Sequence, residues 1–201
     1  MNKNIKAFLI ILLIGIIVAG IMWGIAVKVC KGNKNKQIVE YDLDKIYSSK
    51  AASGYTDIRD LREDYDMDYN YGEAQKDGCL VVGAMVHNED TLTSFIADYT
   101  NKETAFIRIV QRNAKSEVYI IDLFYDSNAD VIYCITDKTR DSSIQDEEQK
   151  KIKLEKFEHM AEYAVYKNNE YWVLYNGDSL DYENIESKVE SGDLYFVSRM
   201  N

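Results

Sequence analysis

The sequence predicts an α+β protein in which an N-terminal transmembrane helix precedes a domain with an antiparallel sheet and a few short helices packed on it. Three observations support this prediction. The chain contains one long uncharged apolar run, several short strand-like runs separated by hairpin-like loops, and only a few short helix-like segments. Hairpins beside segregated helices are typical of an antiparallel α+β design and not of a doubly wound sheet.

The apolar run spans residues 7–27, which include no charged side chain. A helix of that length covers about 30 Å, the thickness of the hydrocarbon core of a bilayer. Trp23 lies near one end, where an indole suits the membrane interface. We therefore predict that residues 1–30 form a retained single-pass anchor, with the membrane as the partner of residues 7–27.

Two other interpretations of this segment are weaker. The apolar region of a cleaved secretory signal is usually about 7–15 residues long, although Gly24-Ile25-Ala26 resembles a cleavage site and leaves cleavage open. A lipoprotein signal needs a small residue before its cysteine, whereas Lys28 and Val29 precede Cys30.

The orientation of the anchor follows from two opposing signals. Four lysines follow the span and two precede it, which slightly favours a cytoplasmic C-terminal domain. A short basic N-terminus that leads directly into an apolar run is instead typical of export. We expect a protein of the cell membrane whose soluble domain is extracytoplasmic. The opposite orientation of the anchor stays open.

The charge of the remaining chain excludes one class of partner. All six basic residues among the first 36 are lysines and no acid occurs there, so 18 of the 24 Lys and Arg and all 34 Asp and Glu follow, a net charge of −16. Such a charge repels phosphates, and we predict no binding to nucleic acid. The acidic surface either serves solubility or attracts cations, basic peptides or divalent metals.

The composition divides the chain further. Residues 31–70 form an acidic stalk rich in Tyr and Asp, and residues 71–201 form the α+β domain. Within the stalk, the spacing of Leu43, Ile46 and Tyr47 predicts a short helix, and Ile58 with Leu61 marks another.

The first part of the domain predicts two helices around a strand. Residues 71–78 form a helix closed by Gly78, and residues 79–82 form a buried strand. Asn88 is a suitable N-cap for the next helix, whose apolar face contains residues at the i, i+3, i+4 and i+7 positions, namely Leu92, Phe95, Ile96 and Tyr99.

The second part of the domain is rich in β-branched and aromatic runs. Three of these predict an antiparallel meander: Thr104–Val110, Glu117–Tyr125 and Val131–Thr136. A charged excursion over 138–151 and a half-exposed strand around Ile152 and Leu154 follow. Two further strands joined at Asn168-Asn169, a helix with its cap at Asp178 or Ser179 and its end at Gly192, and a short last strand complete the prediction, the strands being Glu162–Lys167, Tyr171–Tyr175 and the LYFVS run.

A calcium loop is the first candidate site. Asp64, Asp66, Asp68 and Asn70 alternate as in the start of such a loop. The loop also needs Gly at its sixth position and Glu at its twelfth, where this chain has Tyr69 and Gln75. We therefore predict no metal site and interpret the alternation as a solvated acidic face.

Nucleophilic or acid–base catalysis is the second candidate. His87 and His159 belong to no catalytic motif, and no phosphate-binding glycine loop, G-x-S-x-G or H-E-x-x-H is present. We therefore predict no catalytic and no cofactor-binding residue.

Two more groups of residues could carry chemistry. Cys79 and Cys134 lie in apolar strand-like runs, which favours buried free thiols over a disulfide, although they are the one pair available to an exported domain. The charged run Asp137–Asp141 directly follows a strand. It could bind a ligand, but we interpret it as a solvated turn.

A series of short motifs lies between Gly72 and about Leu174. They are Asp77-Gly78, Asn88 with Leu92 and Phe95, Ile107-Arg108-Ile109-Val110, Asp122-Leu123-Phe124-Tyr125-Asp126 and Asp137-Lys138-Thr139-Arg140-Asp141. Together they resemble a bacterial family, domain-of-unknown-function family 4362, over roughly residues 72–174. Where that family often has E-G-D-P, this chain has A-K-S-E at 114–117. The resemblance implies exported lipoproteins, hence an outside orientation, and no activity.

These observations favour a noncatalytic, membrane-anchored extracytoplasmic domain that binds a protein or cell-envelope partner. The alternative is a small-molecule or cation-binding sensor domain, and an enzyme of unrecognised type is the third reading. No cofactor is predicted.

Overall fold

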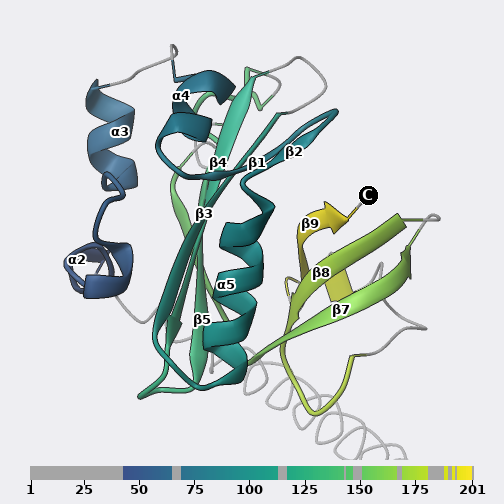
Figure 1. The fold of residues 1–201 in the computed structure, drawn as a ribbon. Coiled ribbons are helices and arrows are strands. Elements are labelled where there is room, and N and C mark those ends of the chain that lie inside the picture. The colour runs from purple at the N-terminus through teal and green to yellow at the C-terminus, as the bar shows by residue number, and fades with distance from the viewer. Residues whose placement is uncertain are drawn as a thin grey trace, which may run out of the picture. The chain divides into compact units, whose positions relative to one another are not determined.

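The computed structural model describes residues 43–64, 69–112, 117–142, 144–146, 151–166, 169–180, 188–189, 192 and 194–200. All of them lie in one compact unit, Asp42–Asn201. The unit is a sheet-rich α+β domain in which short helices accompany two sheets (Figure 1). The predicted α+β class is confirmed.

The larger sheet has six strands in the order β2-β1-β3-β4-β5-β6. In that order the strands are Val86–His87, Leu80–Val82, Ala105–Arg112, Val118–Asp126, Val131–Asp137 and Lys153–Phe157. The predicted meander is confirmed as β3-β4-β5, whose neighbours pair antiparallel along most of their length.

The expectation of a purely antiparallel sheet is wrong, because β1 pairs with β3 in parallel. The chain leaves β1, turns back as β2 and then crosses over through helix α5, Glu89–Thr100, before it enters β3. Parallel strands need a crossover of about a dozen residues or more, and α5 supplies it. The larger sheet is therefore mixed.

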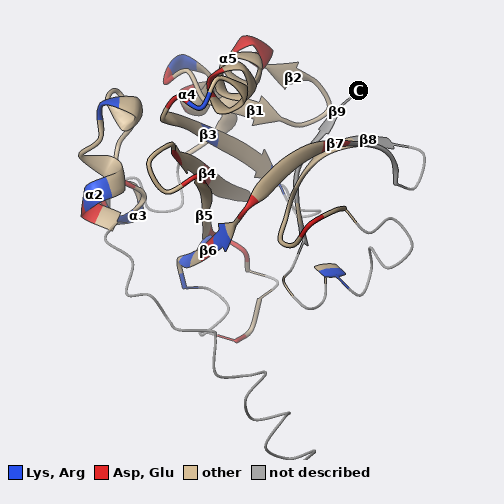
Figure 2. Cartoon of the chain, turned by 90° about the horizontal axis from the view of Figure 1, so that it is seen from below, with Lys and Arg blue, Asp and Glu red and all other residues tan. Residues whose placement is uncertain are grey.

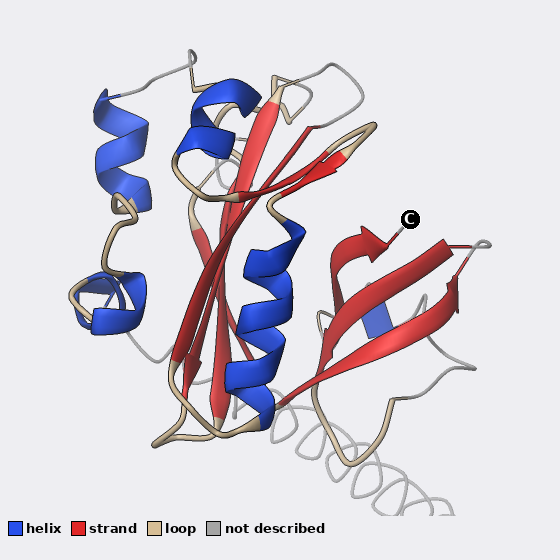
Figure 3. Ribbon diagram, viewed as in Figure 1, coloured by secondary structure: helices blue, strands red, loops and turns tan. Residues whose placement is uncertain are grey.

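A second sheet contains three antiparallel strands in the order β7-β8-β9. They are His159–Tyr166, Asn169–Tyr175 and Leu194–Met200, which confirms the predicted hairpin and last strand. Met160 and Leu174 of this sheet belong to the same buried cluster as Leu92 and Phe95 of α5. Helix α5 and the second sheet therefore share one core with the larger sheet (Figure 3).

The other face of the larger sheet is covered by residues 43–64, which we call the cover segment. It contains α2 (Leu43–Tyr47), the 3-10 helix η1 (Lys50–Ala52) and α3 (Ile58–Asp64). The aromatic rings of Tyr47 and Tyr55 pack on Phe106 of β3, with ring centroids 6.0 and 4.9 Å apart.

The cover segment corrects the predicted domain boundary at residue 70. Both predicted helices exist, but they belong to the compact unit and not to a stalk. Four apolar side chains of the cover segment are almost completely buried, namely Ile46, Ala52, Ile58 and Leu61. The acidic composition of this stretch reflects its outer surface, because only one side of each short helix faces the sheet.

Helix α4, Tyr71–Lys76, begins with a complete capping box. Asn70 accepts from the backbone of Gly72 and Glu73, and the Glu73 carboxylate accepts from the Asn70 amide. After the helix, Gly78 takes a φ of 78°, the left-handed conformation predicted for this position. The sequence signals of this helix are therefore confirmed.

Asn88 occupies the N-cap position of α5, but its side chain does not cap the helix. The backbone there is left-handed, and the Asn88 amide donates to the carbonyls of Gln75 and Cys79. Asn88 therefore joins the start of α5 to the turn between α4 and β1.

Charged residues lie on the helices, on β6 and in the loops, while the central strands are mostly uncharged (Figure 2). No helix within the described residues has the length and hydropathy to cross a membrane. The predicted span at 7–27 lies outside the described residues, as does most of the predicted last helix, including Tyr182 and Ile185.

Replacement of Leu61 tests whether the cover segment belongs to the domain. Leu61 is buried, so Leu61→Ala should lower the free energy of unfolding by about 2–5 kcal/mol. Urea unfolding of the detergent-solubilised full chain, followed by circular dichroism, measures this. Arg62→Ala, at the exposed neighbouring position, should change it by less than about 0.5 kcal/mol. Equal stability of the two variants would contradict the packing described here.

Candidate functional site

The larger sheet buries an ion pair on the face beneath the cover segment. Arg108 of β3 lies directly opposite Asp122 of β4. The guanidinium donates through Nε to Asp122 Oδ1 at 2.8 Å and through Nη2 to Oδ2 at 2.7 Å. Both side chains are buried, with 2% and 0% of their surfaces exposed. This two-point geometry is the strong form of an Arg–carboxylate contact.

The cover segment supplies further hydrogen bonds to this ion pair. The Tyr47 hydroxyl donates to Asp122 Oδ2 at 2.7 Å, and Arg108 Nη2 donates to the Thr56 carbonyl at 2.5 Å. Burial and the adjacent Asp122 carboxylate both raise the pKa of Tyr47, which keeps its hydroxyl protonated as a donor. Burial alone would lower the pKa of Arg108, but Asp122 raises it overall, so the guanidinium stays charged.

A second buried pair lies at the end of β5, whose last residue is Asp137. Arg140 Nη1 donates to Asp137 Oδ2 at 3.1 Å, and Arg140 Nη2 donates to the Leu61 carbonyl at 3.2 Å. The backbone and hydroxyl of Thr139 donate to Asp137 Oδ1 at 2.9 and 2.6 Å. The interpretation of this run as a solvated turn is therefore wrong for Asp137 and Arg140, which are almost completely buried.

Both pairs are engaged by hydrogen bonds within the chain. Within the part of the chain that the structure describes, every buried side-chain nitrogen or oxygen has a hydrogen-bond partner. Each positive charge is matched by a carboxylate and by a carbonyl of the cover segment. The buried charges therefore stabilise the contact between the cover segment and the sheet.

An open pocket lies where the parallel strands β1 and β3 end side by side. We call it the β1–β2 pocket, and its volume is about 560 Å³. Val82, the last residue of β1, pairs with Gln111, so β3 extends one residue further, to Arg112. The pocket is lined by Tyr71, Val82, Gly83, Ala84, Met85, His87, Gln111 and Arg112.

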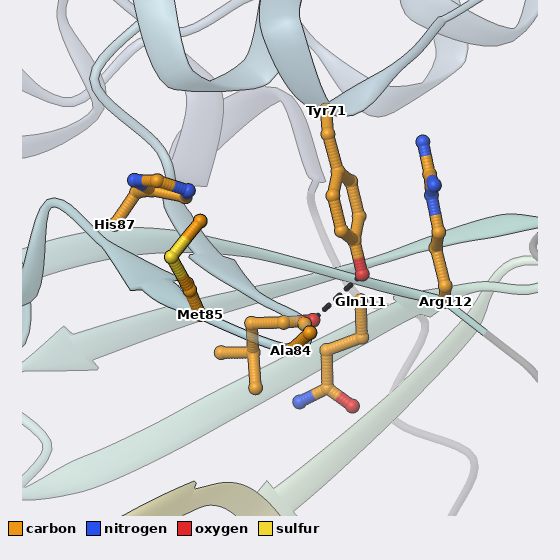
Figure 4. Close-up of a pocket in the computed structure, with 8 residues that line it drawn as sticks. Tyr71, Ala84, Met85, His87, Gln111 and Arg112 are labelled. Carbon is orange, nitrogen blue, oxygen red and sulfur yellow. Dashed lines mark hydrogen bonds between the residues drawn. The ribbon is translucent and has the colours of Figure 1, made fainter. Parts of the chain in front are cut away.

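Tyr71 organises the pocket (Figure 4). Its hydroxyl donates to the Val82 carbonyl at 2.7 Å, which attaches the start of α4 to the end of β1. Its ring lies so close to Gly83 that an added Cβ would be 2.8 Å from Cε2. The guanidinium of Arg112 lies 3.9 Å from the ring centroid. Tyr71 therefore fixes both the turn after β1 and the position of Arg112.

The lining combines apolar surface with positive charge. Met85 is 69% exposed, the more exposed of the two large exposed hydrophobic side chains among the described residues. Among the described residues of the lining, Arg112 carries a permanent positive charge, His87 adds an imidazole, and no Asp or Glu is present. Figure 4 places His87 and Met85 across the pocket from Arg112.

The histidines and cysteines stand as follows. His87 lies in β2 and lines the pocket, whereas His159 begins β7 and packs on Tyr175 with ring centroids 5.1 Å apart. Cys79 and Cys134 are buried free thiols, as predicted. Burial is the main cause that raises the pKa of both thiols, that of Cys79 to about 11.

The calcium-loop candidate falls partly outside the described residues, which omit Asp66 and Asp68. Asn70 serves as the N-cap of α4. Within the described ranges, no group of three or more His, Cys, Asp or Glu side chains is placed to hold a metal ion.

The pocket residues Tyr71, Met85 and Arg112 were not predicted from the sequence. One signal was present, since Gly83-Ala84-Met85 exposes a large apolar side chain in a turn directly after a buried strand. No local sequence pattern indicated Arg112, because its place in the pocket depends on the parallel pairing of β1 with β3.

Comparison of the chain with protein-family models, curated proteins and solved structures found no match in any of the three.

Removal of one member of the buried ion pair should be strongly destabilising. Arg108→Met leaves the Asp122 carboxylate buried without its counter-ion, so the free energy of unfolding should fall by about 3–5 kcal/mol. Replacement of both residues, as Arg108→Met with Asp122→Leu, should restore part of the loss, because no unpaired charge stays buried although the Tyr47 hydroxyl and the Thr56 carbonyl lose their partners. Urea unfolding of the full-length variants measures both effects.

An exposed ion pair provides the control for this experiment. Lys102 and Asp130 are both 60% exposed, so Lys102→Ala should cost less than about 1 kcal/mol. If the double variant were as unstable as Arg108→Met alone, an unpaired buried charge could not explain the loss of stability.

The pKa of Cys79 makes a prediction about alkaline stability. The thiol ionises near pH 11 in the folded chain and near the ordinary value of 9 when unfolded, so the folded state binds more protons between these values. The free energy of unfolding should therefore fall as pH rises from about 9 to 11. In Cys79→Ala this fall should be smaller, by at most about 3 kcal/mol. Parallel pH curves for the two proteins would contradict the prediction.

Proposed function

We propose that the chain is a membrane-anchored, noncatalytic interaction domain that binds a protein or cell-envelope partner at the β1–β2 pocket. The observation that carries the proposal is the grouping of Met85, Tyr71 and Arg112 around one open pocket. Methionine, tyrosine and arginine are enriched in protein interfaces, where aromatic and arginine side chains contribute much of the binding energy.

The state of the charged side chains supports a noncatalytic role. Catalytic acids and bases need a pKa near the working pH and access to a substrate. Arg108 is instead buried, kept charged and engaged by Asp122 and the Thr56 carbonyl. Arg140 is likewise engaged by Asp137 and the Leu61 carbonyl.

The anchor and its direction are part of the proposal. The uncharged run at 7–27 supports attachment to the membrane. The resemblance to domain-of-unknown-function family 4362 stays a prediction, and it favours an extracytoplasmic domain. The unit that follows, from Asp42, would then present its pocket outside the cytoplasm.

The alternative function is that of a sensor for a small molecule. The pocket volume of about 560 Å³ is within the usual range for such ligands, which favours this alternative. A cation is a poorer ligand for the pocket, because the described residues of its lining include Arg112 and no carboxylate.

Photo-crosslinking from the pocket tests the proposed function. A photoreactive phenylalanine analogue at position 85 of the full-length chain should form a discrete cross-linked species on illumination of intact cells, because a bound partner would cover this exposed side chain. Gel mobility and mass spectrometry of the product measure this.

The second exposed hydrophobic position, Val189, supplies the matched control. Its side chain is 40% exposed and does not line the pocket, so the same analogue there should not form the species. Absence of a specific product at position 85, or the same product at both positions, would reject the pocket as the interaction site.

A further inference from the structure

We infer that the β1–β2 pocket binds a segment of a partner protein that presents a carboxylate next to an apolar side chain. The inference rests on the proposed function and adds the chemistry of the partner. It follows from the position of Arg112, the charge of the lining, and the exposure of the turn between β1 and β2.

Arg112 is prepared to bind a carboxylate. Its guanidinium lies over the face of the Tyr71 ring at 3.9 Å, so the planar group is held while its N–H edge stays accessible. The side chain is exposed, and among the described residues no carboxylate forms an ion pair with it. A guanidinium fixed in this way loses little conformational freedom when it forms two parallel hydrogen bonds to a carboxylate.

The charge of the lining selects the same ligand. The chain is rich in Asp and Glu, yet no acidic side chain lines this pocket among the residues that the structure describes. The lining offers one guanidinium and one imidazole, Arg112 and His87, on opposite sides. An anionic group is therefore attracted to this part of an otherwise acidic domain, and a basic segment is not.

The rest of the lining favours an apolar group beside the carboxylate. Met85, Val82 and Ala84 contribute apolar side chains, and the Tyr71 ring adds aromatic surface. Methionine is flexible and polarisable, so it adapts to apolar groups of different shape.

The exposure of the turn favours a macromolecular partner over a small ligand. Pockets for small ligands bury about 70–90% of the ligand surface. Here Gly83 and Ala84 are exposed and Met85 is 69% exposed, so one wall of the pocket is open to solvent. A protein surface can cover this wall and bury Met85.

The experiment is a selection from a library of random short peptides displayed on phage, with the detergent-solubilised full chain as the target. Enriched peptides should combine Asp or Glu with a neighbouring apolar residue. Their affinity for Arg112→Glu should be at least about tenfold lower, because a charge-assisted contact is lost and repulsion replaces it. Arg62→Glu makes the same change of charge at an exposed site on α3 and should leave affinity unchanged.

Three results would overturn the inference. The first is enrichment of basic or purely apolar peptides, and the second is equal affinity of the peptides for Arg112→Glu and the unchanged chain. The third is displacement of the peptides by free octanoate at equal concentration, which would assign the pocket to a small carboxylic acid. Thermal unfolding at the wild-type temperature confirms that the variants fold. The cross-link from position 85 is measured separately, so a cross-link that survives Arg112→Glu rejects the carboxylate but not the interaction domain.

Discussion

The buried ion pair between Arg108 and Asp122 determines how the rest of the domain can be arranged. Two charges inside a sheet lose their hydration, and the loss is offset only when every polar atom finds a partner. The two strands supply the pair itself, but the Tyr47 hydroxyl and the Thr56 carbonyl come from the cover segment. This face of the sheet therefore needs the cover segment, whereas the opposite face is closed by apolar contacts with α5 and the second sheet.

Local signals predicted most of the strands and short helices, because each depends on periodicity or capping within a few residues. The pairing of β3 with β4 shows where such signals stop. A loop at 112–116 would place Ile120 opposite Arg108, but the observed register is shifted by two residues and places Asp122 there. A shift of two keeps every side chain on its face, so hydrophobic alternation cannot distinguish the two registers. The opposite charges of Arg108 and Asp122 favour the observed one.

The β1–β2 pocket depends on contacts that no local pattern contains. It combines the start of α4, the turn after β1 and the end of β3, three segments that the parallel pairing of β1 with β3 brings together. Composition predicted an antiparallel arrangement, in which these chain ends would not meet. The burial of the Asp137–Asp141 run was not predicted for a related reason. The run contacts the Leu61 carbonyl, and Leu61 belongs to a segment whose acidic composition indicated a stalk.

The placement of the cover segment also has a mechanical consequence. The chain enters the compact unit at Asp42 and forms α2 first, so tension applied there acts on the contacts between the cover segment and the sheet. Those contacts include the hydrogen bonds of Tyr47, Thr56 and Leu61 to the two buried ion pairs. Detachment of the cover segment would remove these hydrogen bonds and expose both pairs to water. The contacts of the cover segment are therefore the first part of the domain on which such tension acts.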